Sequence, residues 1–285
     1  MANIRLTLAY DGTRYCGWQV QPNGPTIQAE LQRGLQALTG EPCSVLAAGR
    51  TDAGVHALGQ VANFHTASRI PAENFAAALQ SVLPKDILIR DSRQVADDFH
   101  ATFFARSKRY RYLIKDGAAP WPFLRPCVYH LRSRLDAAAM HAAGQALVGT
   151  HDFRCFETDW PNKASSVRTV LEFRVVRCPA WLAWSTDARF LPGRENENLF
   201  PPAVGTQEDL VCLDIVADGF LYNMVRSITG TLINVGRGKW PPERVAQVLQ
   251  AGDRSLAGAT APPQGLYLVQ VDYDGDDPAA HNVQH

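Results

Sequence analysis

The chain has 285 residues, 46% hydrophobic and 20% charged, and its 28 basic residues balance its 28 acidic ones. Such a composition is typical of a globular protein with a sizeable core, as one large domain or two smaller ones. Zero net charge excludes a chain that is basic as a whole and counts mildly against a nucleic-acid partner, although a local basic face can exist on a neutral protein.

Targeting and membrane segments are not evident. No apolar run approaches the about 20 residues that a membrane-spanning helix needs. The N-terminus MANIRLTLAYDG lacks the pattern of a signal peptide. We therefore expect a soluble, cytoplasmic protein without membrane association.

The first hundred residues predict alternating strands and helices. Apolar and polar residues alternate over 4–10, which is typical of a half-buried strand. Thr26 can cap a helix that carries one apolar face as far as Leu38, and Gly40 ends it. A further helix begins after Pro71, and further strands are expected at 43–48, 59–66 and 87–89.

The stretch AAGRTDAGVHALGQVANFH, from Ala47 to His65, combines polar and very small residues. Arg50, Thr51 and Asp52 follow a glycine and precede Ala53 and Gly54. Small residues beside one carboxylate suggest a backbone that something large approaches closely. Asp and Gly are also common turn residues, so the stretch by itself is more typical of a plain turn.

Aromatic and basic residues alternate in the strand-like segment SKRYRYLIKD. Tyr110 and Tyr112 alternate there with Arg109 and Arg111. The pattern fits either an edge strand guarded by charge or a surface on which a nucleic-acid base can stack.

The second half of the chain follows a proline-rich connection, AAPWPFLRPC, which is the best candidate for a seam between domains. A helix over 135–147, strands over 166–177 and 210–216, two more helices and a last strand over 266–273 follow it. Each half combines strands and helices in an α+β pattern that suggests a topological duplication. A long polar segment, Trp184 to Asp209, interrupts two strands, and the acidic tail from Asp274 has the composition of a disordered end.

Most catalytic and metal-binding motifs are absent. The chain has no phosphate-binding P-loop, no dinucleotide-binding glycine motif, no G-x-S-x-G elbow and no H-E-x-x-H. His56 and His65 lack metal-ligand spacing, and the six cysteines form no zinc pattern. We interpret the cysteines as small buried thiols.

A lone Asp on a small-residue loop can act as a covalent nucleophile if a nearby guanidinium keeps it ionised. Arg226 is a candidate partner because it lies in an otherwise apolar helix segment, MVRSITGTLI. The same residue could instead lie on the solvent face of that helix, and the pattern favours neither interpretation.

Five blocks of the sequence, in order, resemble the tRNA pseudouridine synthase A family. The most specific block is GRTDAGVHALGQVANF, with Arg-Thr-Asp-Ala-Gly at its start. The other four resemblances are YDGTRYCGWQVQP, DDFHATFFARSKRYRYLI, GTHDFRCF and the C-terminal pair GFLYNMVRSITGTLINVG and GLYLVQVDY. Together they span nearly the whole chain.

The resemblance implies that the protein converts uridine to pseudouridine at positions 38, 39 and 40 of the tRNA anticodon arm, without metal or cofactor. It assigns Asp52 as the nucleophile, Tyr110 as the residue that stacks on the target base, Arg226 as the partner of the nucleophile, and Arg50 as an aid to nucleotide extrusion. A cluster of Arg14, Lys108, Arg109 and Arg111 on one face would let a neutral protein bind RNA.

The resemblance also implies the pseudouridine synthase fold: two similar α+β subdomains, each an antiparallel sheet with helices on one face, joined into a central sheet with the cleft between them. We expect a homodimer, with subdomains at 1–106 and 107–273 and a disordered tail at 274–285. Two features depart from the family: the connection from Trp184 to Asp209 is longer than usual, and Cys16 stands where an aromatic residue is common.

Two other functions fit parts of the pattern. A non-catalytic RNA-binding protein could use the KRYRY strand as a stacking platform and would need no particular residue at position 52. A hydrolase of nucleoside sugar bonds would need a second acid near Asp52, and the nearest acids in sequence, Glu41 and Glu73, lie in other elements.

Overall fold

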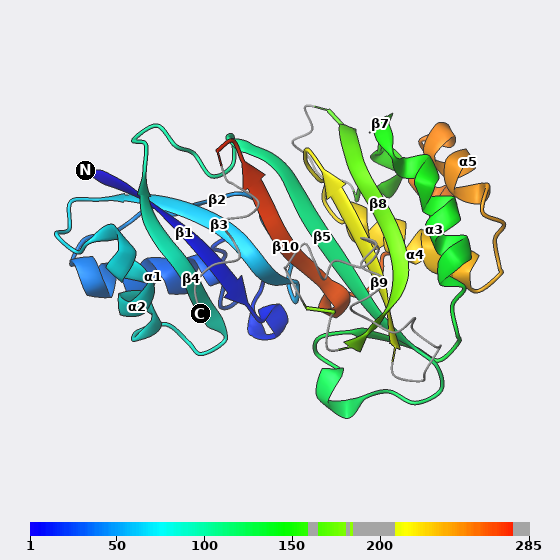
Figure 1. Ribbon diagram of the computed structural model, residues 1–285, viewed down its shortest axis with the longest axis horizontal. Helices are drawn as coiled ribbons and strands as arrows, with labels where there is room; N and C mark the ends of the chain where they lie inside the picture. The colour runs from blue at the N-terminus through cyan, green and yellow to red at the C-terminus, as the bar shows by residue number, and fades with distance from the viewer. Residues whose placement is uncertain (159–164, 181–182, 185–208, 276–285) are drawn as a thin grey trace, which may run out of the picture. The chain divides into compact units, whose positions relative to one another are not determined.

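The computed structural model describes residues 1–158, 165–180, 183–184 and 209–275. Its contacts divide the chain into two compact units, one of Met1–Arg106 with the strand from Tyr267, the other from Ser107 to Leu266. Each unit has its own strands and helices (Figure 1). Nearly all of the long connection 184–209 and of the predicted disordered tail lies outside the described residues.

The first unit is built on the strands β1 (Ala2–Tyr10), β2 (Leu46–Ala47), β3 (His56–Thr66), β4 (Ile87–Val95) and β10 (Leu266–Tyr273). Their order is β4-β1-β3-β10, and β2 pairs with β3. The strand predicted at 43–48 is shorter than expected. Sequence order alone assigns β10 to the 107–273 half, whereas its parallel pairing with β3 through Tyr267 and Leu268 makes it part of the first unit.

Two helices accompany this sheet, α1 (Ile27–Thr39) and α2 (Phe75–Gln80), with short 3-10 turns at Gly12–Arg14 and Ala72–Asn74. Thr26 caps α1 as predicted, since its hydroxyl accepts a hydrogen bond from the amide of Ala29 at 3.3 Å. Phe75 of α2 packs edge to face on Phe64 of β3, with ring centroids 5.3 Å apart. The apolar faces of both helices are therefore buried within the first unit.

The second unit is built on the strands β5 (Ala105–Asp116), β6 (Tyr129–Leu131), β7 (Gly149–Asp152), β8 (Val167–Pro179) and β9 (Asp209–Ala217). Their order is β5-β9-β8-β7, and all three of these pairings are antiparallel. β6 pairs in parallel with the end of β5. β5 is therefore held along Lys108–Ile114 by β9 and along Ile114–Asp116 by β6.

The helices of the second unit are α3 (Ala137–Gly144), α4 (Met224–Gly236) and α5 (Arg244–Ala251). Gly144 of α3 lies directly on the ring of Phe173 in β8, since a Cβ atom there would fall 1.9 Å from a ring carbon. Gly236 of α4 packs on Met140 of α3 in the same way, since a Cβ atom on Gly236 would lie 2.6 Å from the sulfur of Met140. Short 3-10 turns complete the unit at Pro122–Leu124, Gln145–Leu147, Arg154–Phe156, Arg254–Leu256 and Pro263–Gly265.

Both units thus combine sheet and helix in the α+β manner predicted from the sequence. The two parallel pairs, β3 with β10 and β5 with β6, were not expected from the alternation of residues, which carries no strand direction. No helix in the described part of the chain is long and apolar enough to cross a membrane.

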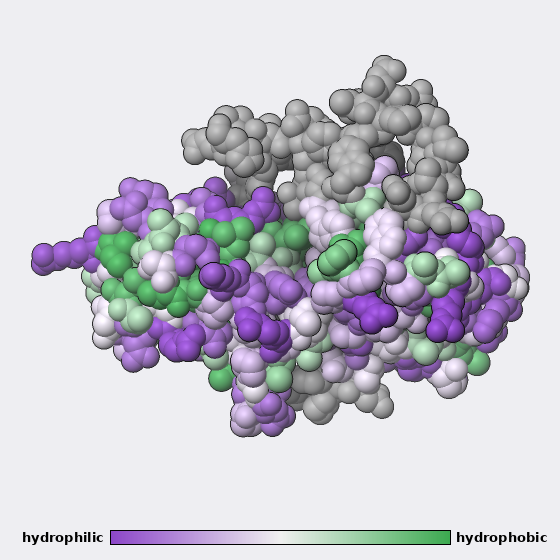
Figure 2. Space-filling model, turned by 90° about the horizontal axis from the view of Figure 1, so that it is seen from below, coloured by the Kyte–Doolittle hydropathy of each residue, from purple (hydrophilic) through white to green (hydrophobic). Residues whose placement is uncertain are grey.

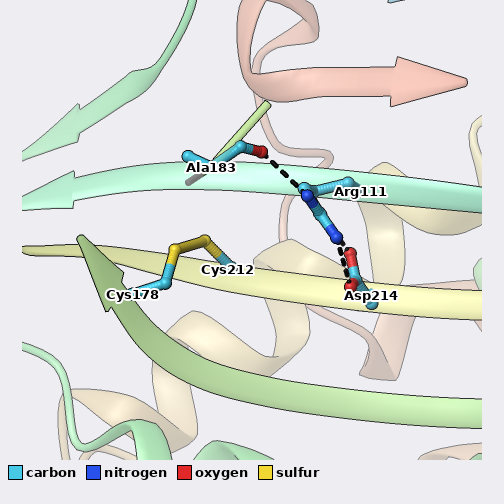
Figure 3. Close-up of a disulfide and its surroundings, with 5 residues drawn as sticks. All are labelled: Arg111, Cys178, Ala183, Cys212 and Asp214. Carbon is cyan, nitrogen blue, oxygen red and sulfur yellow. Dashed lines mark hydrogen bonds and ion pairs between the residues drawn. A yellow bond between two sulfur atoms is a disulfide. The ribbon is translucent and has the colours of Figure 1, made fainter. Parts of the chain in front are cut away.

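One of the predicted surface cations is buried in the core of the second unit. Arg111 is 0% exposed and forms a two-pronged ion pair with Asp214 of β9, at 2.7 and 2.8 Å, while it donates to the carbonyl of Ala183 at 2.9 Å (Figure 3). The register explains the pair, because Arg111 stands directly opposite Asp214. Arg111 therefore guards no strand edge and belongs to no RNA-binding face, contrary to the sequence-based hypothesis.

The interpretation of all six cysteines as buried thiols is wrong for one pair. Cys178 of β8 and Cys212 of β9 form a disulfide, with their Cα atoms 6.6 Å apart (Figure 3). Cys212 stands opposite Val176, so Cys178 is its diagonal neighbour on the adjacent strand. Of the four free cysteines, Cys43 and Cys155 are buried as predicted, whereas two are partly exposed, namely Cys16 and Cys127.

Candidate active site

The loop that carries Asp52 joins β2 to β3 and is fixed through its backbone. The amide of Trp18 donates to the carbonyl of Thr51 at 3.0 Å, and the amide of Val55 donates to the carbonyl of Asp52 at 3.1 Å. The buried hydroxyl of Thr51 lies 2.8 Å from the phenol oxygen of Tyr10. These contacts leave the half-buried side chain of Asp52 on a backbone that is held on both sides.

The segment 12–18 packs against this loop more closely than any residue with a side chain would allow. A Cβ atom on Gly17 would lie 2.5 Å from the carbonyl oxygen of Thr51, and Gly17 has a φ of +92°. Gly12 approaches the carbonyl oxygen of Val55 even more closely, at 2.0 Å for a hypothetical Cβ. The two glycines are therefore required by close backbone contact.

Two buried polar side chains, Gln60 and Tyr10, hydrogen-bond to the loop. Gln60 of β3 is 0% exposed and donates from Nε2 to the carbonyl of Gly49 at 2.7 Å. Burial raises the pKa of Tyr10 to about 12, against smaller opposing effects of its hydrogen bonds with Thr51 and Gln60. The phenol of Tyr10 is thus neutral at physiological pH and holds the loop through its hydrogen bond with Thr51.

Arg50 and Asp52 differ in their surroundings although one residue separates them. The side chain of Arg50 is exposed and makes no hydrogen bond or ion pair within the part of the chain described here. Ala53, on the other side of Asp52, is exposed as well. The carboxylate thus stands between a cation that points to solvent and a residue too small to cover it.

In the second unit, Tyr110 of β5 is 7% exposed and packs edge to face on Phe220, with ring centroids 4.9 Å apart. Phe220 lies three residues after the end of β9, and its own ring is only partly buried. Next along β5, the hydroxyl of Tyr112 donates to the carbonyl of Pro262 at 2.6 Å. Tyr110 is thus held by the segment between β9 and α4, and Tyr112 by the segment that precedes β10.

Arg226 is held by two groups that fix the direction of its guanidinium. Its Nε donates to the carbonyl of Ala261 at 2.8 Å, and its Nη1 donates to the Oδ1 of Asn223 at 2.7 Å. The backbone is tied to the same segment, because the amide of Ala261 donates to the carbonyl of Arg226 at 3.0 Å. The side chain is half-buried, so it does not extend freely from the solvent face of α4.

Asn223 is a candidate positioning residue that the sequence reasoning missed. It precedes α4 with a φ of +62°, the one positive φ outside glycine among the described residues. Its side-chain amide also donates to the hydroxyl of Thr158 at 3.0 Å. Asn tolerates the left-handed region better than most residues, so an Asn before an expected helix was the one available signal.

The predicted site residues thus fall into two groups. Arg50 and Asp52 lie in the first unit, on the β2–β3 loop, and Tyr110 and Arg226 lie in the second, next to the segment 220–226. Gly17, which the sequence offered only as part of a loop, packs closely on the backbone of Thr51 and Asp52 in the first unit. In the described part of the chain, no group of three or more His, Cys, Asp or Glu residues is placed to hold a metal ion.

The predicted basic face is also reduced by ion pairs of Arg14 and Arg109. Arg14 donates to Asp86 at 2.9 Å, and Arg109 donates to Glu172 at 2.8 Å. On the face in view in Figure 2, hydrophobic residues are interspersed among hydrophilic ones. Recognition of a polyanion would therefore depend on individual cations. Among the four cations that the sequence predicted for this face, Lys108 has no ion-pair partner within the described residues.

Comparison with known proteins identifies the family. The sequence profile of the tRNA pseudouridine synthases matches residues 7–103 and 143–274. The chain belongs to the tRNA pseudouridine synthase family. The matched segments include Arg50, Asp52 and Arg226, and the interval between them contains Tyr110.

Relatives that match over their full length indicate the same family as the profile. The chain is similar to tRNA pseudouridine synthase A of Acetivibrio thermocellus, with 42% identity over 273 residues, 96% of this chain and 100% of the relative. It is 43% identical over 276 residues to that of Moorella thermoacetica, again 96% of this chain and 100% of the relative. The predicted family and its enzyme class, an isomerase that forms pseudouridine in tRNA, are thereby confirmed.

Proposed function

We propose that Asp52 is the nucleophile of this isomerase and that the uridines converted are those at positions 38, 39 and 40 of tRNA. The observation that carries the proposal is the loop from Thr51 to Val55. Its backbone is clamped by the segment 12–18, while the carboxylate side chain itself is left half-exposed beside a very small residue. A nucleophile needs this combination of fixed position and open approach.

The reaction exchanges one bond of the ribose for another. The bond between ribose C1′ and uracil N1 breaks, a bond between C1′ and C5 forms, the proton leaves C5, and N1 gains a proton, so the atoms balance without a co-reactant. Asp52 splits this exchange into two steps by bonding covalently to the nucleotide, either at C1′ or at the uracil ring, and by leaving when the new carbon–carbon bond has formed.

The target nucleotide has to leave the helical stack before its glycosidic bond can be attacked, at a cost of a few kcal/mol. We propose that Arg50, whose side chain extends into solvent, occupies the vacated space. Tyr110 receives the extruded uracil by stacking, which contributes about 1–3 kcal/mol, and assists removal of the C5 proton. The stacking gain is comparable to the cost of extrusion, so both events can occur together.

Arg226 supplies the positive charge that keeps the nucleophile ionised in the substrate complex. Its guanidinium is oriented in advance by Asn223 and Ala261, so little side-chain entropy remains to be lost when it engages an anion.

Assembly and location complete the proposal. We infer a homodimer that binds the tRNA anticodon arm in the cytoplasm, on the basis of the family alone. Light scattering after gel filtration tests the dimer, since a single species at the mass of one chain would contradict it.

A single assay separates this function from the two alternatives. Transcripts of one tRNA are prepared with uridine at only position 38, 39 or 40, each labelled with tritium at C5. Release of tritium, together with pseudouridine in the digested product, supports the isomerase. Binding without release would identify a non-catalytic RNA-binding protein, and free uracil as product would identify a sugar-bond hydrolase.

A further inference from the structure

Two cations stand together on the second unit close to Tyr110, and neither the family assignment nor the proposed chemistry uses them. Lys108 lies two residues before Tyr110 on β5, so both side chains leave the same face of the strand. Arg168 lies two residues before Val170 on β8. The register places Lys108 opposite Ala217 of β9 and Ala217 opposite Val170.

This register brings the two side chains to one end of one sheet face. β5 and β8 are both antiparallel to β9, so they run in the same direction with β9 between them. Their backbones are therefore about 10 Å apart, two strand spacings, which long side chains span. The same end of β9 leads through Asp218 and Gly219 to Phe220, the ring on which Tyr110 packs.

Arg168 is oriented by backbone carbonyls and forms no ion pair with any residue that the structure describes. Its Nη1 donates to the carbonyls of Val167 and Ser165, at 2.6 and 3.1 Å. A Cβ atom on Gly219 would lie 3.3 Å from its Nε, so the absence of a side chain at 219 leaves that nitrogen uncovered. Carbonyl groups fix the guanidinium in this arrangement, and its remaining donors face away from them.

Lys108 is half-buried and, within the described residues, its ammonium makes no hydrogen bond or ion pair. Burial lowers its pKa, Arg168 lowers it further, and only Asp218 opposes them. The carboxylate of Asp218 is already engaged, because its Oδ1 accepts from the amide of Thr169 at 3.0 Å. Two like charges held side by side, with the single carboxylate of Asp218 opposing them, are unfavourable in the free protein, and a further anion would relieve them.

We propose that Lys108 and Arg168 form a phosphate subsite that binds the RNA backbone next to the target uridine. The inference rests on the proposed function, because it takes Tyr110 as the residue that receives the base. The nucleotide that carries the base brings its own flanking phosphodiesters to this end of the sheet. The subsite fixes the backbone while the base is turned, and it acts by positioning, without contact with the reacting bonds.

The test measures the affinity of an anticodon stem-loop RNA by fluorescence anisotropy over a range of salt concentrations. The protein carries Asp52→Asn so that binding is read without turnover. Lys108→Gln and Arg168→Gln are each expected to weaken binding and to reduce the slope of log Kd against log salt by about 1, the change for one lost phosphate contact. Lys239→Gln is the matched control, because Lys239 is exposed and follows the opposite end of α4; it leaves slope and affinity unchanged.

A second experiment identifies which phosphate of the RNA the subsite contacts. A neutral methylphosphonate replaces, one at a time, each phosphate that flanks the target uridine. At one of these positions, we expect the replacement to weaken binding by the protein that keeps Lys108 and Arg168. The same replacement is expected to cause no further loss of affinity in the Lys108→Gln protein. Additive effects at every position would overturn the subsite. This arm keeps the proposal testable if Lys108→Gln fails to fold, because the intact protein must still lose affinity.

Tritium release keeps this inference separate from the proposed function. In a protein with Asp52 intact, Lys108→Gln raises KM for tRNA more than it lowers kcat, and Lys108→Arg restores KM. If the intact enzyme releases no tritium, the proposed function fails. If it releases tritium and both glutamine variants keep the salt slope of the parent protein, only the phosphate subsite is refuted.

Discussion

Gly17→Ala is the substitution that tests most directly how the first unit holds Asp52. Gly17 has a φ of +92°, which costs a residue with a side chain about 1–2 kcal/mol. The added Cβ would also lie 2.5 Å from the carbonyl oxygen of Thr51 and 3.1 Å from the carbonyl carbon of Asp52. Cβ atoms essentially never approach a heavy atom within 3.0 Å, so the loop has to retreat by at least about 0.5 Å.

That displacement acts on the backbone of the proposed nucleophile itself. A misplacement of about 1 Å can cost a factor of 10² in rate, so we expect kcat to fall by about 10-fold to 100-fold. The free energy of unfolding falls by about 2–4 kcal/mol, the sum of conformational strain and overpacking. Single-turnover tritium release measures the rate, and urea denaturation followed by circular dichroism measures the stability.

Gly40→Ala is the matched control in the same unit. Gly40 ends α1 with a φ of +76°, and nothing lies within 4 Å of its hypothetical Cβ. The control therefore carries the conformational cost, about 1 kcal/mol, without the clash. Equal rates for Gly17→Ala and the parent enzyme, or an equal loss of rate in Gly40→Ala, would refute the argument that close packing positions the loop.

Three further substitutions probe other parts of the account. Asn223→Ala removes the acceptor that orients Arg226 at 2.7 Å, so kcat falls about 10-fold while tRNA affinity, measured by anisotropy, changes little. Asp214→Asn leaves Arg111 charged and buried, so urea denaturation shows a loss of about 3–5 kcal/mol. Burial raises the pKa of Tyr10 to about 12, so the folded state holds this proton more tightly than the unfolded state does. The free energy of unfolding therefore has its full contribution from Tyr10 below pH 10 and loses up to about 2.7 kcal/mol as the pH rises from 10 to 12. Tyr10→Phe removes this part of the pH dependence.

Each of these expectations has a result that contradicts it. An unchanged kcat in Asn223→Ala would show that Arg226 needs no orienting group. A loss in Asp214→Asn no larger than that in Glu172→Gln, which breaks the more exposed pair with Arg109, would show that the buried ion pair carries no special weight. Parallel stability curves of the parent and Tyr10→Phe between pH 10 and 12 would contradict the raised pKa.

The elements of the fold were predictable because local patterns specify them. The alternation from Ile4 to Tyr10 and the cap at Thr26 both correspond to observed elements, since burial of one face and a satisfied helix end are local requirements. Strand partners are set by contacts between distant residues. The parallel pairing of β10 with β3 and the disulfide between Cys178 and Cys212 depend on such contacts, so spacing in the sequence could not indicate them.

The site was predictable to a different degree for each residue. Asp52 was singled out by its motif, whereas the close packing around the loop comes from Gly12 and Gly17, which lie outside that motif. Arg111 was misjudged because an alternating strand pattern does not tell which face is covered, and the counter-charge at Asp214 lies 103 residues away. Asn223 was missed because its role comes from a positive φ and a bond to Arg226, neither of which has a sequence pattern strong enough to detect.

The measurement that tests the central claim most directly is single-turnover tritium release from C5-labelled tRNA by the parent enzyme and by Asp52→Asn. The substitution keeps the shape of the side chain and removes its nucleophilic charge, and anisotropy confirms that tRNA is still bound. Asp98→Asn, at an exposed aspartate in the same unit, is the control. The account predicts release by the parent and by Asp98→Asn and none by Asp52→Asn; release by Asp52→Asn at the rate of the parent would contradict it.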